Sequence, residues 1–296
     1  MHDWTVPAVP LGRSGMTVTA VGYGSLPLGG TYGPIDDDDA LDLLRGVLDA
    51  GIDFIDTSMV HGDGHVETLV GRAVKGCRDE VIIATKFGMT ATGLGRPNRV
   101  RPMLEESLRR LGTDYVDLYY LHQLDPTTPI EDTIGAMADL VREGLIRAIG
   151  LSEVTPATLR RAHETYPITA VQAEYSLLSR EVEAELLPTT RALGISFIAY
   201  SPLARGLLSG RIRRPEDMPP DDARRVRYPR FAGEALARNL AAAQQLFRLA
   251  DELGTTPADL ALGWVLATHN VIPIPGTRRL ELFEENLETA RSALSG

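Results

Sequence analysis

The chain has 296 residues, of which 44% are hydrophobic and 24% are charged, and its formal net charge at pH 7 is -10. This composition supplies enough apolar material for a large core, which excludes a disordered or low-complexity protein. The acidic balance excludes the binding of nucleic-acid phosphates as the main activity.

The chain carries a single cysteine, Cys77, which cannot form an internal disulfide. No apolar run reaches the roughly 18 residues that a membrane span needs. The first four residues, from Met1 to Trp4, lack the basic and apolar regions of a secretion signal. We therefore expect a cytoplasmic protein that does not insert into a membrane.

Short apolar runs alternate with helical patterns along most of the sequence. A turn at residues 11–15 first separates two short extended pieces. The later runs are rich in Val, Ile, Tyr and Phe without polar alternation, which is typical of strands buried on both faces. The predicted strands are residues 18–23, 52–56, 81–86, 115–122, 146–152, 170–176, 195–201 and 271–276.

The helices between these strands have recognisable ends. The patterns at residues 36–50, 99–111, 130–143 and 236–253 each stop at a glycine, the residue that most readily adopts a left-handed helix cap. Strict alternation of strands and helices, with no linker between two composition zones, favours one closed ring over two doubly wound domains. The sequence therefore predicts an α/β fold of the (β/α)8 TIM-barrel type, with residues 1–296 forming a single domain.

One long segment, at about residues 202–234, interrupts this alternation. It is rich in Arg, Pro and Asp, and its length predicts a lid or a specificity loop. Its arginines alternate with acidic residues, which indicates a mainly solvated surface, with a minority of them facing an anionic substrate or cofactor phosphates.

Polar residues end several of the apolar strands. In a (β/α)8 barrel the carboxyl ends of the strands meet at the face that holds the active site. The second, third and fourth predicted strands end at Asp56, Lys86 and His122. Each residue alone could simply cap a helix or satisfy a buried hydrogen bond. Together they form a titratable cluster in which a buried lysine would require a carboxylate partner, and this predicts a functional site.

The ordered motifs resemble those of the aldo-keto reductases, which are NADP(H)-dependent oxidoreductases built on this barrel. The resemblance covers essentially the whole chain. The segments that carry it are residues 11–15, 51–57, 85–88, 121–122, 150–153, 172–176, 200–203, 274–277 and 284–286.

The resemblance implies a catalytic tetrad of Asp56, Lys86, His122 and the residue at position 61. The family places a tyrosine five residues after the aspartate, and that tyrosine protonates the carbonyl oxygen. Here position 61 is His61. Imidazole has an ordinary pKa of about 6.5, and a neighbouring ammonium group lowers it. We expect His61 to be neutral at pH 7, able to donate a hydrogen bond or to pass on a proton from His122 or water.

Three interpretations of His61 follow. It acts as a weaker general acid, which predicts slow carbonyl reduction that accelerates toward acidic pH. Alternatively, the site has moved to another reaction on the bound cofactor. In the third interpretation, the residue is an engineered replacement that traps a complex. Replacing His61 by tyrosine tests whether position 61 limits the chemistry.

The resemblance also implies the residues that bind the cofactor. Ser152 and Gln172 would hold the nicotinamide amide, and the ring of Tyr200 would stack on the nicotinamide. A phosphate-binding loop and the start of the last helix would hold the remaining groups. The residues of these two segments are Ser201, Leu203, Gly206, Gly276, Thr277, Arg278, Arg279, Glu285 and Asn286. The two arginines suit an adenosine 2′-phosphate and predict NADP(H) over NAD(H).

The sequence thus predicts reduction of an aldehyde or ketone to an alcohol, with a small carbonyl compound as substrate and no nucleic-acid partner. The alternatives are reduction of a conjugated alkene, another repurposed reaction, or a low-turnover subunit that senses NADP(H). Residues 22–24 lack the third spaced glycine of a Rossmann nucleotide-binding turn. No metal is predicted, because the glycines between His61 and His65 disfavour a regular helical i, i+4 pair and no third ligand is apparent.

Overall fold

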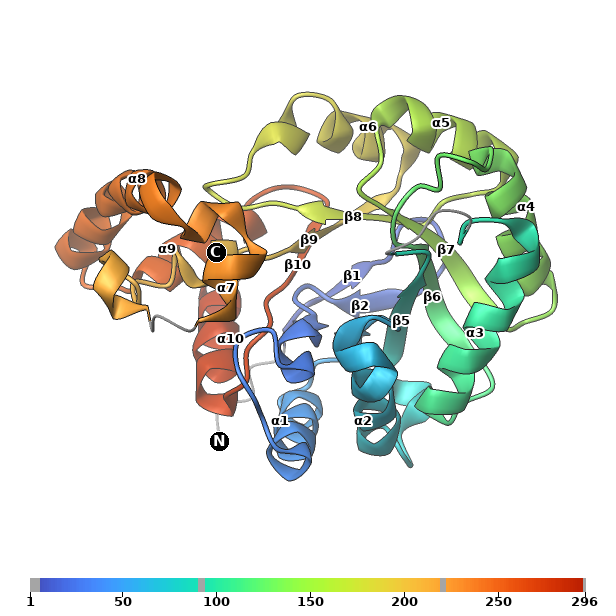
Figure 1. Ribbon diagram of the computed structural model, residues 1–296, viewed down its shortest axis with the longest axis horizontal. Coiled ribbons are helices and arrows are strands. Elements are labelled where there is room, and N and C mark those ends of the chain that lie inside the picture. Colours follow the sequence, from blue (N-terminus) through green and yellow to red (C-terminus); the bar gives the residue numbers. More distant parts are fainter. Residues whose placement is uncertain (1–5, 90–93, 219–221, 295–296) are drawn as a thin grey trace.

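The computed structural model describes residues 6–89, 94–218 and 222–294 (Figure 1). The chain start, from Met1 to Trp4, on which the expectation of no secretion signal rests, lies outside these ranges. So do residues 219–221 of the predicted lid and the two ends of the predicted single domain. Within the described ranges, no helix is both long enough and apolar enough to cross a membrane.

Eight parallel strands form the centre of the molecule, in the spatial order in which they follow along the chain. They are β3 (Tyr23–Gly24), β4 (Phe54–Asp56), β5 (Ile82–Phe87), β6 (Val116–Leu121), β7 (Ile146–Ser152), β8 (Ala170–Glu174), β9 (Ser196–Tyr200) and β10 (Val271–Ile274). The first and last strands meet through backbone hydrogen bonds from Gly22 to Pro273 (3.0 Å) and from Gly24 to Pro275 (3.3 Å). These bonds close the ring, and the predicted (β/α)8 barrel is confirmed.

Helices surround this ring of strands (Figure 1). Their bounds are α1 (Asp37–Asp49), α2 (His65–Ala73), α3 (Pro97–Leu111), α4 (Ile130–Arg142), α5 (Pro156–Thr165), α6 (Leu186–Leu193), α7 (Ala223–Arg227), α8 (Gly233–Leu253), α9 (Pro257–Leu266) and α10 (Leu280–Leu294). Gly112 and Gly254 end α3 and α8 with φ angles of 63° and 65°, as the glycine stops predict. The outward faces of the strands and the inward faces of the helices share one large apolar core.

The prediction of a single strand at residues 18–23 is wrong. Its first part, β2 (Thr17–Thr19), pairs in an antiparallel hairpin with β1 (Ala8–Pro10), and only β3 belongs to the barrel. Asp53 separates the two parts, because its Oδ1 accepts hydrogen bonds from the backbone N–H (2.6 Å) and the hydroxyl (2.9 Å) of Thr19. The chain then turns toward the barrel. Alternation of apolar residues could not reveal this break.

The inside of the barrel has its own apolar core, made of side chains from β4 to β10. Leu11, in the hairpin turn, belongs to this core and is fully buried. Tyr120 fits beside Gly150 on the neighbouring strand, where a Cβ atom would lie 2.3 Å from its ring. The barrel is therefore filled by side chains, and the space for a ligand lies at its rim.

The segment at residues 202–234 is more ordered than predicted. It contains α7 and the short 3-10 helices η5 (Ala204–Gly206), η6 (Pro215–Asp217) and η7 (Pro229–Phe231). Apolar residues of this segment form a separate core with α8 and α9. In Figure 1 the segment and α8 lie together at one side of the barrel. A fixed apolar base thus supports the polar side chains that the segment presents.

Candidate active site

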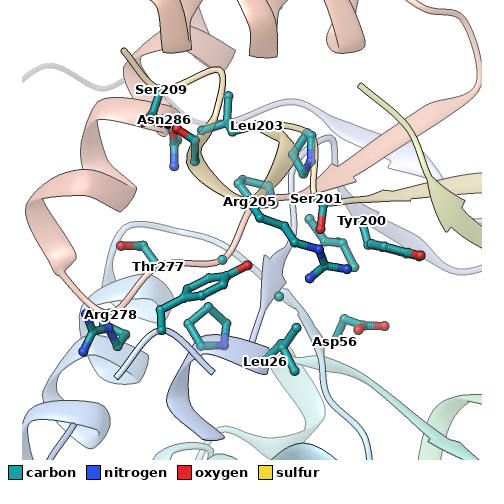
Figure 2. A pocket seen from close by; sticks show the side chains of 18 of the residues that line it. Leu26, Asp56, Tyr200, Ser201, Leu203, Arg205, Ser209, Thr277, Arg278 and Asn286 are labelled. Carbon is teal, nitrogen blue, oxygen red and sulfur yellow. Dashed lines mark hydrogen bonds between the residues drawn. The ribbon is translucent and has the colours of Figure 1, made fainter. Parts of the chain in front are cut away.

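Every residue that the sequence predicted for the site lines one cavity of about 630 Å³. The cavity opens at the carboxyl ends of the strands: Asp56 ends β4, Ser152 ends β7 and Tyr200 ends β9. Figure 2 shows Thr277, Arg278 and Asn286 on one side of the cavity and Tyr200 and Asp56 on the other. Barrel closure thus brings together residues that lie up to 230 positions apart, from Asp56 to Asn286.

Asp56 and Lys86 form a buried ion pair in the cavity wall. The Lys86 ammonium donates to Asp56 Oδ1 and to the carbonyl oxygen of Thr57 (2.8 Å). The amide of Gln172 donates to the other carboxylate oxygen of Asp56 at 2.7 Å. Burial lowers the pKa of Lys86, and the Asp56 carboxylate opposes that change. The pair therefore holds a fixed ammonium group where a negatively charged oxygen could develop in a reaction.

His61 begins the short helix η2 (His61–Gly64) and its ring is buried in the cavity wall. Its Nδ1 lies 3.2 Å from the buried hydroxyl of Ser25. Burial is the main cause that lowers the pKa of His61 well below its ordinary value, and electrostatic repulsion of a second positive charge by Lys86 and by the His122 site lowers it further. A lowered pKa favours the neutral form of this imidazole at pH 7, in the direction of the prediction.

His122 follows β6 directly and has a similar arrangement. Its Nδ1 lies 3.2 Å from the hydroxyl of Ser58, and burial together with Lys86 lowers its pKa to about 3. A hydroxyl that donates to Nδ1 leaves the ring proton on Nε2. The two serines can therefore give both imidazoles an N–H group on the side away from the serine.

Close backbone contact brings Ser25 to His61. The short helix η1 (Leu26–Gly29) packs on η2 so tightly that a Cβ atom on Gly29 would lie 2.6 Å from the backbone nitrogen of Gly62. Gly62 itself has a φ of 55°, a conformation that glycine adopts at little cost. Gly29 and Gly62 thus allow the close contact between η1 and η2 that brings Ser25 to His61.

The opposite side of the cavity is cationic, and the backbone of Gly276 there packs closely on that of Gly24. A Cβ atom on Gly276 would lie 2.3 Å from the carbonyl oxygen of Gly24. Thr277 Oγ1 accepts a hydrogen bond from the N–H of Arg279 (3.2 Å), just before α10 begins. Arg278 donates to the carbonyl oxygen of Pro34 (2.8 Å). Guanidinium groups at a helix start suit a bound phosphate.

Several cavity residues were not predicted. Leu26, Tyr32, Val60, Arg205 and Tyr228 line the cavity from the connections between strands and helices, Leu26 and Arg205 from the short helices η1 and η5. None of them ends an apolar strand, so the strand-end signal could not find them. Among the arginines predicted to be mainly solvated, Arg224 belongs to the minority that faces the cavity, and it donates to the backbone of Arg205 (2.8 Å).

His61 and His65 do not share a ligand. The ring of His65 turns to the surface and its Nε2 lies 2.7 Å from Asp37 Oδ1. Among the residues described, no group of three or more His, Cys, Asp or Glu side chains is placed to hold a metal ion.

Comparison with known proteins gives matches over the whole chain. The model of the Aldo/keto reductase family matches residues 20–295. A probable aldo-keto reductase 1 from Glycine max is 40% identical, and the alignment covers 100% of this chain and 87% of that protein. The aldo-keto reductase str7 from Strobilurus tenacellus is also 40% identical, with 98% and 89% covered.

Two solved structures are similar in fold. The thermostable aldo-keto reductase Tm1743, in complex with the inhibitor epalrestat, superposes with a TM-score of 0.77 at 33% identity and covers 96% of this chain and 93% of its own. The glycerol dehydrogenase AKR11B4 from Gluconobacter oxydans has a TM-score of 0.82 at 29% identity, with 97% and 95% covered.

Proposed function

The chain belongs to the aldo/keto reductase family, and we propose that it reduces an aldehyde or ketone to an alcohol with NADP(H) as cofactor. The observation that carries this proposal is the meeting of the Asp56–Lys86 pair with two neutral imidazoles, His61 and His122, on one cavity. A carbonyl oxygen that gains negative charge is stabilised by an ammonium group and by N–H donors placed before the reaction.

The residues of the cavity fit a phosphorylated dinucleotide. Gly276 lines the cavity, and Arg278 and Arg279 supply the positive charge for a 2′-phosphate. Ser152 and Gln172 would hold the nicotinamide amide beside the ring of Tyr200. When bound, the reduced nicotinamide supplies a hydride to the carbonyl carbon.

In this proposal His122 orients and polarises the carbonyl, and His61 takes the acid position that tyrosine has in the resembling family. Neutral imidazole is a good hydrogen-bond donor and a weak acid. His61 therefore stabilises the developing alkoxide, and the proton that completes the alcohol comes more readily from protonated His61 at acidic pH or from water. Lys86 stabilises the alkoxide until that proton arrives.

The proposal is tested by titrating the protein with NADPH and then adding a panel of aldehydes and ketones. We expect saturable NADPH binding and oxidation of NADPH that depends on the carbonyl compound, with an alcohol as product. Binding without any turnover would favour a sensing subunit, and a product reduced at a carbon–carbon double bond would favour alkene reduction. Either outcome would contradict the proposed reaction.

The choice between NADPH and NADH should depend on Arg278. A hydrogen bond between charged groups contributes about 1.5–3 kcal/mol, so Arg278→Met should raise the Kd for NADPH by about 10- to 100-fold. The Kd for NADH should change little, because NADH has no 2′-phosphate. Fluorescence titration with both nucleotides measures the effect. Arg142→Met removes the same charge from the exposed face of α4 and should leave both values unchanged. An equal loss of affinity for both nucleotides would contradict binding of the 2′-phosphate by Arg278, because it would mean that Arg278 contacts a group that NADPH and NADH share.

The hydroxyl of Ser25 should set the tautomer of His61. If Ser25 donates to Nδ1, Ser25→Ala removes the preference for the Nε2–H form and lowers kcat by about 2- to 10-fold, the value of one hydrogen bond. Long-range proton–nitrogen NMR on the free protein reads the tautomer directly. Ser58→Ala is the matched control, because it should alter His122 and leave His61 unchanged. An unchanged His61 tautomer in Ser25→Ala would contradict this role.

A further inference from the structure

The cavity is lined by more positive than negative side chains, although the chain as a whole is acidic. The cationic residues are Lys86, Arg205, Arg211, Arg224, Arg278 and Arg279, and the acidic ones are Asp56, Glu153 and Glu285. Several of the cations have close carboxylate partners: Lys86 pairs with Asp56, Arg211 with Glu285 (2.9 Å) and Arg224 with Asp222 (2.7 Å). The remaining positive charge indicates that the cavity receives anionic groups.

Arg205 has a different environment from these paired cations. Within the described part of the chain its carboxylate partner is Glu174, at 3.9 Å. Glu174 is already held by Arg230, with which it forms a closer ion pair, and by the hydroxyl of Ser179 at 2.8 Å. The charge of Glu174 is therefore shared, and it neutralises Arg205 only in part. The Arg205 side chain is 9% exposed, so solvent screens little of the remaining charge.

The Arg205 guanidinium lies between two aromatic rings of the cavity. Its central carbon is 4.0 Å from the ring centre of Tyr228 and 5.7 Å from that of Tyr200, and it donates to the Tyr228 hydroxyl at 3.2 Å. Figure 2 shows Arg205 pointing to the side of Tyr200 and Asp56, whereas Arg278 lies at the opposite side. Arg205 is thus placed near the proposed reaction centre and away from the proposed 2′-phosphate site.

The backbone around Arg205 is held in an unfavourable conformation. Ala204 and Arg205 have φ angles of 48° and 57°, which side chains other than glycine rarely adopt. The buried neighbours Leu207 and Leu208 anchor the segment in its own apolar core. Such strain persists where the surrounding packing over-determines it, and it gathers at functional sites. Here it directs a guanidinium group into the cavity.

We propose that Arg205 is the substrate's anion-binding residue and that the preferred substrates are carbonyl compounds carrying a carboxylate. This inference rests on the proposed carbonyl reduction. Guanidinium has five N–H donors in a planar fork that matches a carboxylate, and hydrogen bonds to the side chains of Tyr228 and Tyr32 engage part of this fork. The same chemistry would bind the pyrophosphate of the cofactor, so the experiment must distinguish the two anions.

The first arm compares para-carboxybenzaldehyde with its methyl ester at saturating NADPH. A charged hydrogen bond is worth about 1.5–3 kcal/mol, so Arg205→Met should lower the ratio of kcat/KM for the acid over the ester by about 10- to 100-fold. Arg205→Lys keeps the positive charge but lacks the planar fork of the guanidinium. Its acid-to-ester ratio should therefore lie between that of the unsubstituted protein and that of Arg205→Met. Arg213→Met is the matched control, because Arg213 lies in the same segment, pairs with Asp251 and does not line the cavity. It should leave the ratio unchanged.

The second arm needs no turnover. Calorimetric titration with para-(hydroxymethyl)benzoate should show binding that Arg205→Met weakens by a similar factor, while the Kd for NADPH stays within about 2-fold and confirms that the variant is folded. If no carbonyl compound is reduced but this binding still depends on Arg205, the proposed reaction fails and the subsite stands. If Arg205→Met weakens NADPH and leaves the acid-to-ester ratio intact, the guanidinium serves the cofactor and the inference is overturned. An unaltered ratio together with unaltered binding of the benzoate would also overturn it.

Discussion

Replacing His61 by tyrosine should raise the turnover of a neutral aldehyde at pH 7 by about 10²-fold or more. A well-placed general acid contributes about 10²–10⁴ to a rate, and the buried, neutral imidazole of His61 supplies little of that at neutral pH. A phenol has an ordinary pKa of about 10, closer to the demand of protonating an alkoxide than the N–H of neutral imidazole. The hydroxyl of a tyrosine at position 61 would also extend farther from the backbone than the imidazole N–H of His61.

The dependence on pH separates the two proteins. The pKa of folded His61 lies well below 6.5, so the protonated fraction is small at pH 7 and grows as the pH falls toward that pKa. The rate of the unsubstituted protein should therefore rise with acidity. His122, with a pKa of about 3, stays neutral over most of this range and does not cause the rise.

Steady-state kcat measured between pH 5 and pH 8 with saturating NADPH tests both expectations. We expect a slope toward acidic pH in the unsubstituted protein and a flatter, higher profile in His61→Tyr. Equal turnover of the two proteins across a panel of carbonyl compounds would show that position 61 does not limit the reaction. NADPH affinity is the control, because the substitution lies outside the residues proposed to hold the cofactor.

The second large effect should come from Lys86→Met, in both activity and stability. Loss of the ammonium removes the charge that stabilises the alkoxide, and we expect kcat to fall by about 10²-fold or more. The substitution also leaves the Asp56 carboxylate buried without its counter-ion. Breaking a buried ion pair from one side costs about 3–5 kcal/mol of folding free energy.

A double substitution distinguishes the two consequences. Lys86→Met with Asp56→Asn removes both charges, so urea unfolding should show much of the lost stability restored, while the activity stays low. The restored stability would show that the single variant suffers from an unpaired carboxylate. If Lys86→Met unfolds at the same urea concentration as the unsubstituted protein, the pair is not the buried, mutually dependent unit that the geometry indicates.

The residues at the strand ends were the part of the site that sequence could predict. Asp56, Lys86 and His122 stand at or just after the ends of apolar runs, and parallel strands in a closed barrel bring such positions to one rim. The register of the strands then decides which side chains face the cavity. For this reason the strand-end positions alone were sufficient to predict that these residues, far apart in the chain, lie together in the cavity.

Other features depend on contacts that composition does not encode. The strand predicted at residues 18–23 is divided because Asp53, the residue just before β4, binds Thr19. Arg205 and Arg224 belong to a segment whose alternating charges are typical of a solvated surface. They turn inward because aromatic rings, those of Tyr228 and Tyr32 among them, accept their guanidinium groups. Such tertiary partners are invisible in a single sequence.

The most direct measurement follows the hydrogen atom itself. The protein is incubated with an aldehyde and NADPH that carries deuterium at the reactive carbon of the nicotinamide ring, and the product is analysed by mass spectrometry and NMR. The account predicts one deuterium atom on the carbinol carbon of the alcohol, with the amount reduced in Lys86→Met and increased in His61→Tyr. Recovery of unreacted aldehyde with the label still on NADPH, or label on an alkene carbon of an unsaturated substrate, would contradict it.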